Sequence, residues 1–258
     1  MHRKILITGS NGFIGKNLVV RLGELAQTHI STFTRGDDPS RLHEILENVD
    51  SVVHLAGENR PNNDAAYSKV NAELTRILCN AIKIVYVQTG RHIPILLASS
   101  TQAEKDNPYG RSKLAAEQEL IALSKSTDNP CIVFRFPGVF GKWCKPNYNS
   151  VVATFCYNLA RDLPIHQTDP DTTLKLVYID DVISCILNEL NQPELGYKHS
   201  VIQPEYQLTL GELAAHIRSF SECRSTLKSE RVGSGLLRAL YATYISYLPE
   251  ERFSYELP

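Results

Sequence analysis

A glycine-rich turn at the first junction between a strand and a helix constrains the fold of this chain more than any other feature. The apolar run Lys4–Thr8 predicts a strand buried on both faces, and 12–26 carries leucines at helical spacing. Between the two, "TGSNGFIG" spaces glycines at positions 9, 12 and 15. A strand, such a turn and a helix bring backbone amides and a helix N-terminus to a pyrophosphate. The turn therefore predicts a dinucleotide site.

Beyond this turn, strands and helices continue to alternate as far as Phe136. The sequence predicts strands at 29–34, 50–56, 93–99 and 131–136, with helices at 40–48, 65–86 and 108–124. Alternation of this kind favours a parallel sheet with right-handed crossovers. We therefore predict an α/β fold of the Rossmann type, a doubly wound parallel sheet.

After Phe136 the pattern changes and indicates a smaller second part. Here the sequence predicts helices at 149–160 and 180–191, a strand at 174–179, and a helix that begins with "TLGELAAHI". We expect an NADP-binding domain over 1–145 together with about 174–192. We expect a small C-terminal substrate-binding lobe over about 146–173 and 193–258.

Charge and cysteine usage exclude several classes of protein. With 27 basic and 28 acidic residues, the formal net charge is −1, which gives no electrostatic reason to expect nucleic acid or an anionic membrane as partner. No apolar run approaches the ~18 residues that span a bilayer. The six cysteines are scattered, without C-x-x-C pairs or histidines at zinc spacing. We expect reduced thiols, no metal and a cytoplasmic location.

The residue that follows the second predicted strand indicates which dinucleotide is bound. A free ribose 2′-hydroxyl usually meets an acidic residue about 20 positions beyond the glycine loop. This sequence has Arg35 there, in "TFTRGDD". Because a guanidinium suits a 2′-phosphate, Arg35 favours NADP(H) over NAD. The alternative is that Arg35 is a solvated surface charge.

Three side chains form a candidate catalytic group. "PYGRSK" places Tyr109 and Lys113 four residues apart, on one face of a predicted helix. An adjacent ammonium is expected to lower the pKa of the Tyr109 phenol, which could then exchange a proton with a carbinol oxygen. Ser99 and Ser100 end the fourth predicted strand, where a hydroxyl could bind the same oxygen.

Together these motifs resemble the extended short-chain dehydrogenase/reductase family. The matching segments run from Lys4 to about Asp181 and include HLAG (54–57), VNAEL (70–74), LASS (97–100), RFPGVFG (135–141) and VYIDDV (177–182). The resemblance implies that Ser100, Tyr109 and Lys113 are catalytic, and that members mostly act on nucleotide-activated sugars. It also implies a larger set of cofactor-binding residues: Gly9, Asn11, Gly12, Phe13, Ile14, Gly15, Arg35, Leu55, Ala56, Gly57, Asn71, Ser99, Lys113, Phe136, Gly138 and Val139.

The catalytic group is shared by reductases, epimerases and dehydratases. Related 4,6-dehydratases carry an Asp-Glu pair directly after the catalytic hydroxyl, where this chain has Thr101 and Gln102, so dehydration is disfavoured. A UDP-hexose 4-epimerase would hold NAD tightly, whereas a reductase would release NADP, which Arg35 favours. A dinucleotide-sensing module without catalysis is a third alternative, and the intact catalytic group argues against it.

Longer segments resemble the reductase domain of CapF-type enzymes, which make capsule and O-antigen precursors. They are 54–61, 104–118, 140–161 and 241–255. The resemblance implies NADPH-dependent reduction at C4 of a UDP-4-keto-6-deoxy-N-acetylhexosamine. The implied product is UDP-N-acetyl-6-deoxy-L-talosamine, a precursor of UDP-L-FucNAc. In that family a cupin domain usually follows, and this sequence stops at Pro258, about where it would begin. We also expect a homodimer.

The segment "FGKWCKPNYNSVVATFC" (140–156) is the candidate wall of the substrate site. It directly follows the strand that the resemblance places beside the nicotinamide. Its amides, cations and aromatic rings could contact a sugar or diphosphate, while Cys144 and Cys156 have no ligand cluster around them. The alternative is a packed interdomain loop. The expected substrate-binding residues are Arg60, Thr101, Lys142, Trp143, Asn147 and Asn149.

Overall fold

The structure of this chain, a computed structural model, describes residues 3–59 and 67–253. It divides into two compact units. Unit 1 comprises 1–136 with 183–202, and unit 2 comprises 137–182 with 203–258. Each unit is described by itself.

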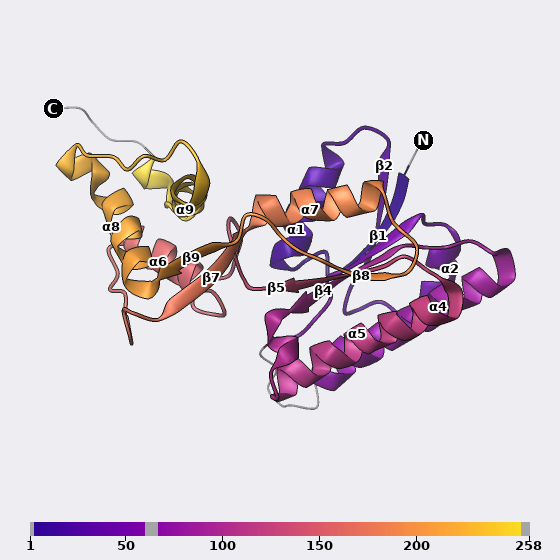
Figure 1. Cartoon of the computed structure of the whole chain (residues 1–258). Helices are drawn as coiled ribbons and strands as arrows, with labels where there is room; N and C mark the ends of the chain where they lie inside the picture. Colours follow the sequence, from indigo (N-terminus) through magenta and orange to yellow (C-terminus); the bar gives the residue numbers. More distant parts are fainter. Residues whose placement is uncertain (1–2, 60–66, 254–258) are drawn as a thin grey trace. The chain divides into compact units, whose positions relative to one another are not determined.

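Unit 1 is built on a six-stranded parallel sheet with the order β2-β1-β3-β4-β5-β8 (Figure 1). This finding confirms the predicted doubly wound α/β fold. In a parallel sheet all carboxyl ends lie at one edge, so the residues that follow β1, β3 and β4 come together there. The strands are β1 (Arg3–Thr8), β2 (Thr28–Phe33), β3 (Ser51–His54), β4 (Ile95–Ser100), β5 (Cys131–Phe136) and β8 (Tyr197–Ser200).

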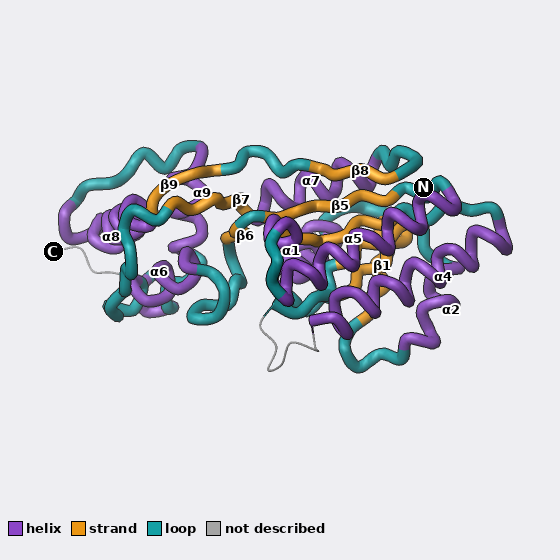
Figure 2. Tube along the Cα trace, turned by 60° about the horizontal axis from the view of Figure 1, so that its bottom comes forward, coloured by secondary structure: helices purple, strands orange, loops and turns teal. Residues whose placement is uncertain are grey.

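Helices cover both faces of this sheet. Helices α1 and α7 lie over one face, and α4 and α5 lie over the other (Figures 1 and 2). Beneath α4 and α5, buried side chains such as Leu6, Val52 and Leu97 pack against Leu78 and Leu120 in one apolar core. The helical elements are α1 (Phe13–Gly23), a 3₁₀ turn (Pro39–Arg41), α2 (Leu42–Glu47), a π-helical segment (Ser68–Glu73), α4 (Leu74–Thr89), a 3₁₀ turn (Thr101–Glu104), α5 (Pro108–Thr127) and α7 (Ile179–Asn191).

Unit 2 has a three-stranded sheet, β6-β7-β9, in which β6 and β7 are parallel and β9 is antiparallel to β7. Its core joins Phe140, Phe155, Leu213 and Leu240. A capping box between Thr209 and Glu212 begins α8, the longest described helix of this unit. The elements are β6 (Gly138–Phe140), α6 (Val151–Leu159), β7 (Thr173–Tyr178), β9 (Tyr206–Thr209), α8 (Leu210–Thr226), α9 (Gly235–Ile245) and a 3₁₀ turn (Glu250–Arg252).

The strands of the second half of the chain are divided between the two sheets. The sequence assigns 174–192 to the dinucleotide-binding domain, but the structure pairs β7 with β6 and β9, and β8 takes the sixth place in the large sheet. Strand β8 is a polar edge strand, Tyr-Lys-His-Ser, without the apolar alternation that reveals a strand in sequence. Only its backbone pairing with β5 shows that this segment is a strand.

Within the described residues, no helix is both long and apolar enough to cross a membrane.

Candidate active site

The glycine loop after β1 requires the absence of side chains at two positions. Gly9 has φ +71°, and a Cβ there would lie 2.6 Å from the Ala56 nitrogen. A Cβ at Gly15 would lie 2.3 Å from the Gly9 carbonyl oxygen, whereas one at Gly12 would lie 3.2 Å from that oxygen. Glycine at 9 and 15 therefore allows the loop, the groove at Ala56 and helix α1 to approach each other closely.

This loop fits a dinucleotide pyrophosphate. Gly12 is the N-cap of α1 and has no side chain to cover the first backbone N–H groups of the helix. Exposed Asn11 and half-buried Phe13 and Ile14 flank the same turn. An uncovered helix N-terminus attracts phosphate through its amides and its dipole.

Arg35 and Glu58 form an ion pair where β2 and β3 end. The Arg35 Nη2 lies 2.7 Å from the Glu58 Oε2, and the Arg35 side chain is 82% exposed. The sequence shows the guanidinium but not its carboxylate partner, which comes from the segment after β3. The ion pair therefore lies at the edge of the sheet where the carboxyl ends of its strands meet.

Tyr109 and Ser100 come together between α5 and the end of β4. Asn107 caps α5 by accepting a hydrogen bond from the Gly110 N–H at 2.8 Å, which places Tyr109 in the first turn. Burial raises the pKa of Tyr109, a hydrogen bond with Ser100 opposes this effect, and Tyr67 adds to it. The sequence predicted a lowered pKa, and that prediction is wrong because burial dominates. The phenol is therefore held in its protonated form.

Lys113 lies one turn beyond Tyr109 and is almost fully buried. Its Nζ donates to the Ala98 carbonyl at 2.9 Å and lies 5.9 Å from the centroid of the Tyr109 ring. Burial lowers the pKa of Lys113 to about 8, and the carboxyl of Glu117 counteracts this effect. A Cβ at Gly57 would lie 3.1 Å from this Nζ, so the groove after β3 reaches Lys113.

Asn71 is a positioning residue in the π-helical segment. Its amide Nδ2 donates to the Glu58 carbonyl at 3.0 Å and to the Ser112 hydroxyl at 2.9 Å, and its Oδ1 accepts from the Glu58 N–H at 2.8 Å. Ser112 donates in turn to the Tyr109 carbonyl at 2.7 Å. Asn71 thus ties the groove after β3 to the first turn of α5.

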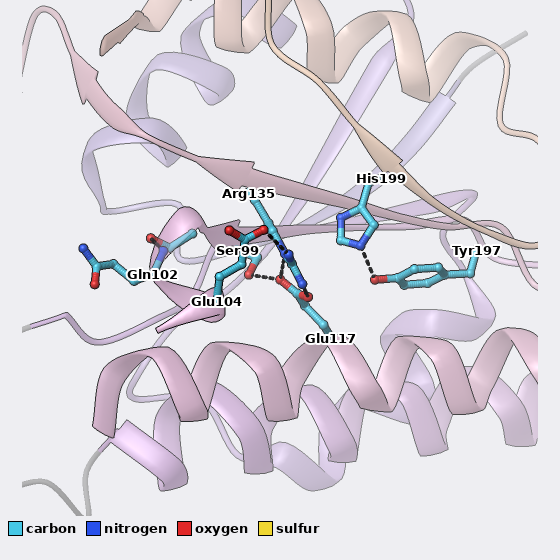
Figure 3. A network of polar contacts seen from close by, with 8 residues as sticks. Ser99, Gln102, Glu104, Glu117, Arg135, Tyr197 and His199 are labelled. Carbon is cyan, nitrogen blue, oxygen red and sulfur yellow. Dashed lines mark hydrogen bonds and ion pairs between the residues drawn. The ribbon is translucent and has the colours of Figure 1, made fainter. Parts of the chain in front are cut away.

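Ser99, Glu104, Glu117 and Arg135 form a charged network that the sequence analysis did not identify (Figure 3). Glu117 is 1% exposed, and the Arg135 Nη2 donates to its Oε2 at 2.6 Å. Arg135 also reaches the Glu104 Oε1 at 2.8 Å. The Ser99 hydroxyl donates to Glu117, so this side chain is engaged beneath α5, whereas Ser100 turns toward Tyr109. Strand alternation sends the two serines to different sides.

The remaining predicted residues fall in different parts of the chain. Thr101 is exposed after β4, and Phe136 is buried at the end of β5. Leu55 donates its N–H to the Thr8 carbonyl at 3.1 Å. Gly138 and Val139 lie in β6 of unit 2. Arg60 lies outside the described residues.

The expected substrate residues of 140–156 lie in unit 2. Lys142 Nζ lies 5.2 Å from the centroid of Trp143, and Trp143 is 49% exposed. Asn147 and Asn149 are exposed, and the Asn147 N–H donates to the Thr154 hydroxyl at 3.0 Å. The hydroxyl of Ser150 already caps α6, so the helix start near Asn149 has an internal acceptor. The Tyr247 hydroxyl donates to the Cys144 carbonyl and connects this loop to the segment that follows α9.

In residues 3–59 and 67–253, no group of three or more His, Cys, Asp or Glu side chains could hold a metal ion. All six cysteines are free thiols.

Comparison with known proteins identifies relatives of the whole chain. Residues 5–203 match the model of the NAD dependent epimerase/dehydratase family. The UDP-2-acetamido-2,6-beta-L-arabino-hexul-4-ose reductase of Pseudomonas aeruginosa is 45% identical over 255 residues, which cover 99% of this chain and 68% of that protein.

Solved structures agree with this match. The capsular polysaccharide assembling protein CapF from Staphylococcus aureus superposes with a TM-score of 0.84 at 36% identity, over 100% of this chain and 69% of that chain. A UDP-glucuronic acid 4-epimerase from Bacillus cereus, in complex with NAD, gives a TM-score of 0.77 at 18% identity, over 95% of this chain and 98% of that chain, and shows the fold alone. The chain spans about two thirds of the length of the reductase and of CapF.

Proposed function

The chain belongs to the NAD dependent epimerase/dehydratase family, the extended short-chain dehydrogenases/reductases, and we propose that it is an NADPH-dependent nucleotide-sugar ketoreductase. The proposed substrate is a UDP-4-keto-6-deoxy-N-acetylhexosamine. The proposed product is a UDP-N-acetyl-6-deoxy-talosamine type of sugar, which would serve UDP-L-FucNAc synthesis for capsule or O-antigen. The name of the 45% identical relative, a reductase of a hexul-4-ose, supports this substrate class.

The cluster of Ser100, Tyr109 and Lys113 carries the proposal. When bound, the reduced nicotinamide supplies a hydride to the C4 carbonyl carbon of the sugar. Tyr109 donates its phenolic proton to the oxygen, which takes up the electron pair of the broken π bond, so that the ketone becomes an alcohol. The raised pKa of Tyr109 keeps this proton available, and the Ser100 hydroxyl orients the oxygen.

Lys113 would act through its charge and its position. A buried ammonium near the phenol stabilises the phenolate that remains after proton transfer. We also assign Lys113 to the hydroxyls of the nicotinamide ribose, beside the groove at Gly57. Leu55, Ala56 and the glycine loop would complete the cofactor site.

The residues after Ser100 argue against dehydration. Thr101 is exposed, and Gln102 accepts a hydrogen bond from the Asn107 amide at 3.3 Å. Neither side chain can exchange a proton with C5 or C6 of a sugar as a carboxyl group would. Besides the hydride, reduction needs only the proton that Tyr109 provides.

The preference for NADPH rests on Arg35. Its guanidinium is exposed to solvent after the end of β2, and its Nη2 forms an ion pair with Glu58. A 2′-phosphate could bind its remaining N–H groups.

We assign the exposed side chains of 140–149 in unit 2 to the UDP-sugar, because their mixture of amides, cations and an aromatic ring suits a sugar diphosphate.

The free thiols support a cytoplasmic location. A homodimer remains a prediction.

A direct assay tests the proposal. Purified protein is offered NADPH or NADH with each isomer of UDP-4-keto-6-deoxy-N-acetylhexosamine, and cofactor absorbance and product NMR are followed. We expect NADPH oxidation and a C4 alcohol, and about 10²–10⁴-fold slower turnover in Tyr109→Phe. Arg35→Ala should lose the preference for NADPH over NADH.

The control is Tyr86→Phe in α4, outside the site, which should match the wild type. Tightly bound NAD in the purified protein, with interconversion of UDP-hexoses and no net NADPH consumption, would identify an epimerase and refute the reductase.

A further inference from the structure

His54 is a buried histidine that the proposed chemistry does not use. It ends β3, is 1% exposed, and lies beside Thr8 in the register of β1 and β3. Its Nδ1 is 2.6 Å from the Thr8 hydroxyl, and its Nε2 is 2.9 Å from the Thr75 hydroxyl. Both hydroxyls are fully buried, so each hydrogen bond is made without competition from water.

The neighbours of His54 determine where its proton lies. The Thr75 hydroxyl donates its single proton to the Asn71 carbonyl at 2.6 Å, so it can only accept from the His54 Nε2. A neutral imidazole that is protonated on Nε2 has a bare Nδ1, which accepts from Thr8. Thr8 is then free to accept from the Ala56 N–H at 3.2 Å, and every donor meets an acceptor.

The imidazole is also neutral. Burial, together with the nearby positive charge of Lys113, lowers the pKa of His54 to about 3. A second proton would sit on Nδ1 and meet the Thr8 hydroxyl as a donor, which would reverse the direction of that hydrogen bond.

The ends of this chain of hydrogen bonds lie in the two halves of the candidate site. One end is the Ala56 N–H, in the groove that Gly9 approaches so closely that a Cβ would lie 2.6 Å from that nitrogen. The other end is Asn71, whose amide reaches Ser112 and through it the turn of α5 that carries Tyr109.

We propose that His54 is a positioning residue, a neutral imidazole protonated on Nε2, which fixes the cofactor groove at Ala56 relative to the turn of α5 that carries Tyr109. The inference deepens the proposed function and rests on it for turnover, whereas the tautomer and cofactor affinity can be measured without any sugar substrate.

The two hydroxyls allow the halves to be separated. Thr8→Val removes the acceptor of Ala56 and the donor to Nδ1, so we expect the Kd for NADPH to rise roughly five- to tenfold. Thr75→Val removes the link to Asn71, so we expect kcat to fall by a similar factor while the Kd for NADPH stays within about twofold. Thr243→Val is the matched control, because Thr243 is 1% exposed and donates to the carbonyl four residues before it, but lies in unit 2.

The tautomer is read from nitrogen NMR of the full chain labelled with ¹⁵N-histidine, with His54→Gln to assign the signal and the exposed His29 as internal reference. We expect a proton on Nε2, none on Nδ1, and no titration of His54 between pH 5 and pH 8. A proton on Nδ1, or titration in that range, overturns the proposal even if both threonine variants fail to fold.

The kinetic outcome is equally decisive. Equal changes of Kd and kcat in both threonine variants, or none, would show that His54 does not join two separable halves. Should the wild type bind NADPH but reduce no sugar, the proposed function fails, while the NMR result and the Thr8→Val affinity still judge the inference.

Discussion

The two polar systems that meet helix α5 differ in charge. The charged network of Ser99, Glu104, Glu117 and Arg135 places a buried carboxyl group one turn beyond Lys113. The neutral chain consists of the Ala56 N–H, Thr8, His54, Thr75 and Asn71. It reaches Ser112 of α5 through the Asn71 amide and contains no ion.

Lys113 explains why the two regions differ. The carboxyl of Glu117 raises the pKa of Lys113 against the effect of burial, whereas the charge of Lys113 lowers the pKa of His54. The Glu117 carboxylate thus stabilises the buried Lys113 ammonium, and this ammonium in turn disfavours a positive charge on His54. In this site the charged network changes the pKa of Lys113, whereas the neutral chain through His54 positions the backbone.

Breaking the charged network should have the largest effect. Arg135→Met leaves the Glu117 carboxyl, 1% exposed, without its ionic partner. A buried carboxylate that loses its ion-pair partner is costly, and the charge of Lys113 offsets only part of that cost. We therefore expect the free energy of unfolding to fall by about 3 kcal/mol in urea titrations at pH 7.

Two further variants qualify that result. Adding Glu117→Gln to Arg135→Met should restore part of the lost stability, since the buried charge is then gone. Glu104→Gln removes a carboxyl that is 70% exposed and should cost less than about 0.5 kcal/mol. Equal losses for Arg135→Met and Glu104→Gln would contradict the role given to Glu117.

The neutral chain should make stability depend on acid. The pKa of His54 is about 3 in the folded protein and about 6.5 in an unfolded chain, so the unfolded state binds more protons between these values. Stability that is present above pH 6.5 is therefore lost as the pH falls. Relative to His54→Gln, the wild type should lose about 1 kcal/mol more between pH 6 and pH 5 in denaturant titrations. Parallel pH profiles would mean that His54 is not held neutral.

Glu117→Gln tests whether the charged network acts on Lys113. The pKa of Lys113, about 8, should fall when the carboxylate charge is removed, so the ammonium is lost as pH rises through a lower value. We expect the alkaline limb of kcat/KM for NADPH-dependent reduction to move to lower pH. Glu104→Gln is the control and should leave that limb in place. If the alkaline limb did not move in Glu117→Gln, the charged network would not control the pKa of Lys113.

Local patterns were sufficient for the main features of unit 1. "TGSNGFIG" follows a run of buried apolar residues, and backbone sterics permit such a loop only with glycine at 9 and 15. Tyr109 and Lys113 share a helical face because they are four residues apart. Both inferences need only covalent spacing and the periods of strand and helix.

Long-range partners were not accessible from such patterns. Glu117 looks like an ordinary helical surface residue in "LAAEQ", yet Arg135, 18 positions away, makes it a buried ion-pair member. His54 begins the motif HLAG, from which we inferred only the cofactor groove. Its hydrogen-bond partners Thr8 and Thr75 lie 46 and 21 positions away. The direction of the Tyr109 pKa was misjudged because burial cannot be read from a motif.

The sequence by itself determined the parallel sheet, the phosphate loop and the spacing of the catalytic side chains, because each depends on residues that are close along the chain. The tertiary structure decided which strand completes the sheet, which carboxyl group Ser99 contacts and which charges surround Lys113. These depend on register, burial and desolvation, which arise only when distant segments pack together.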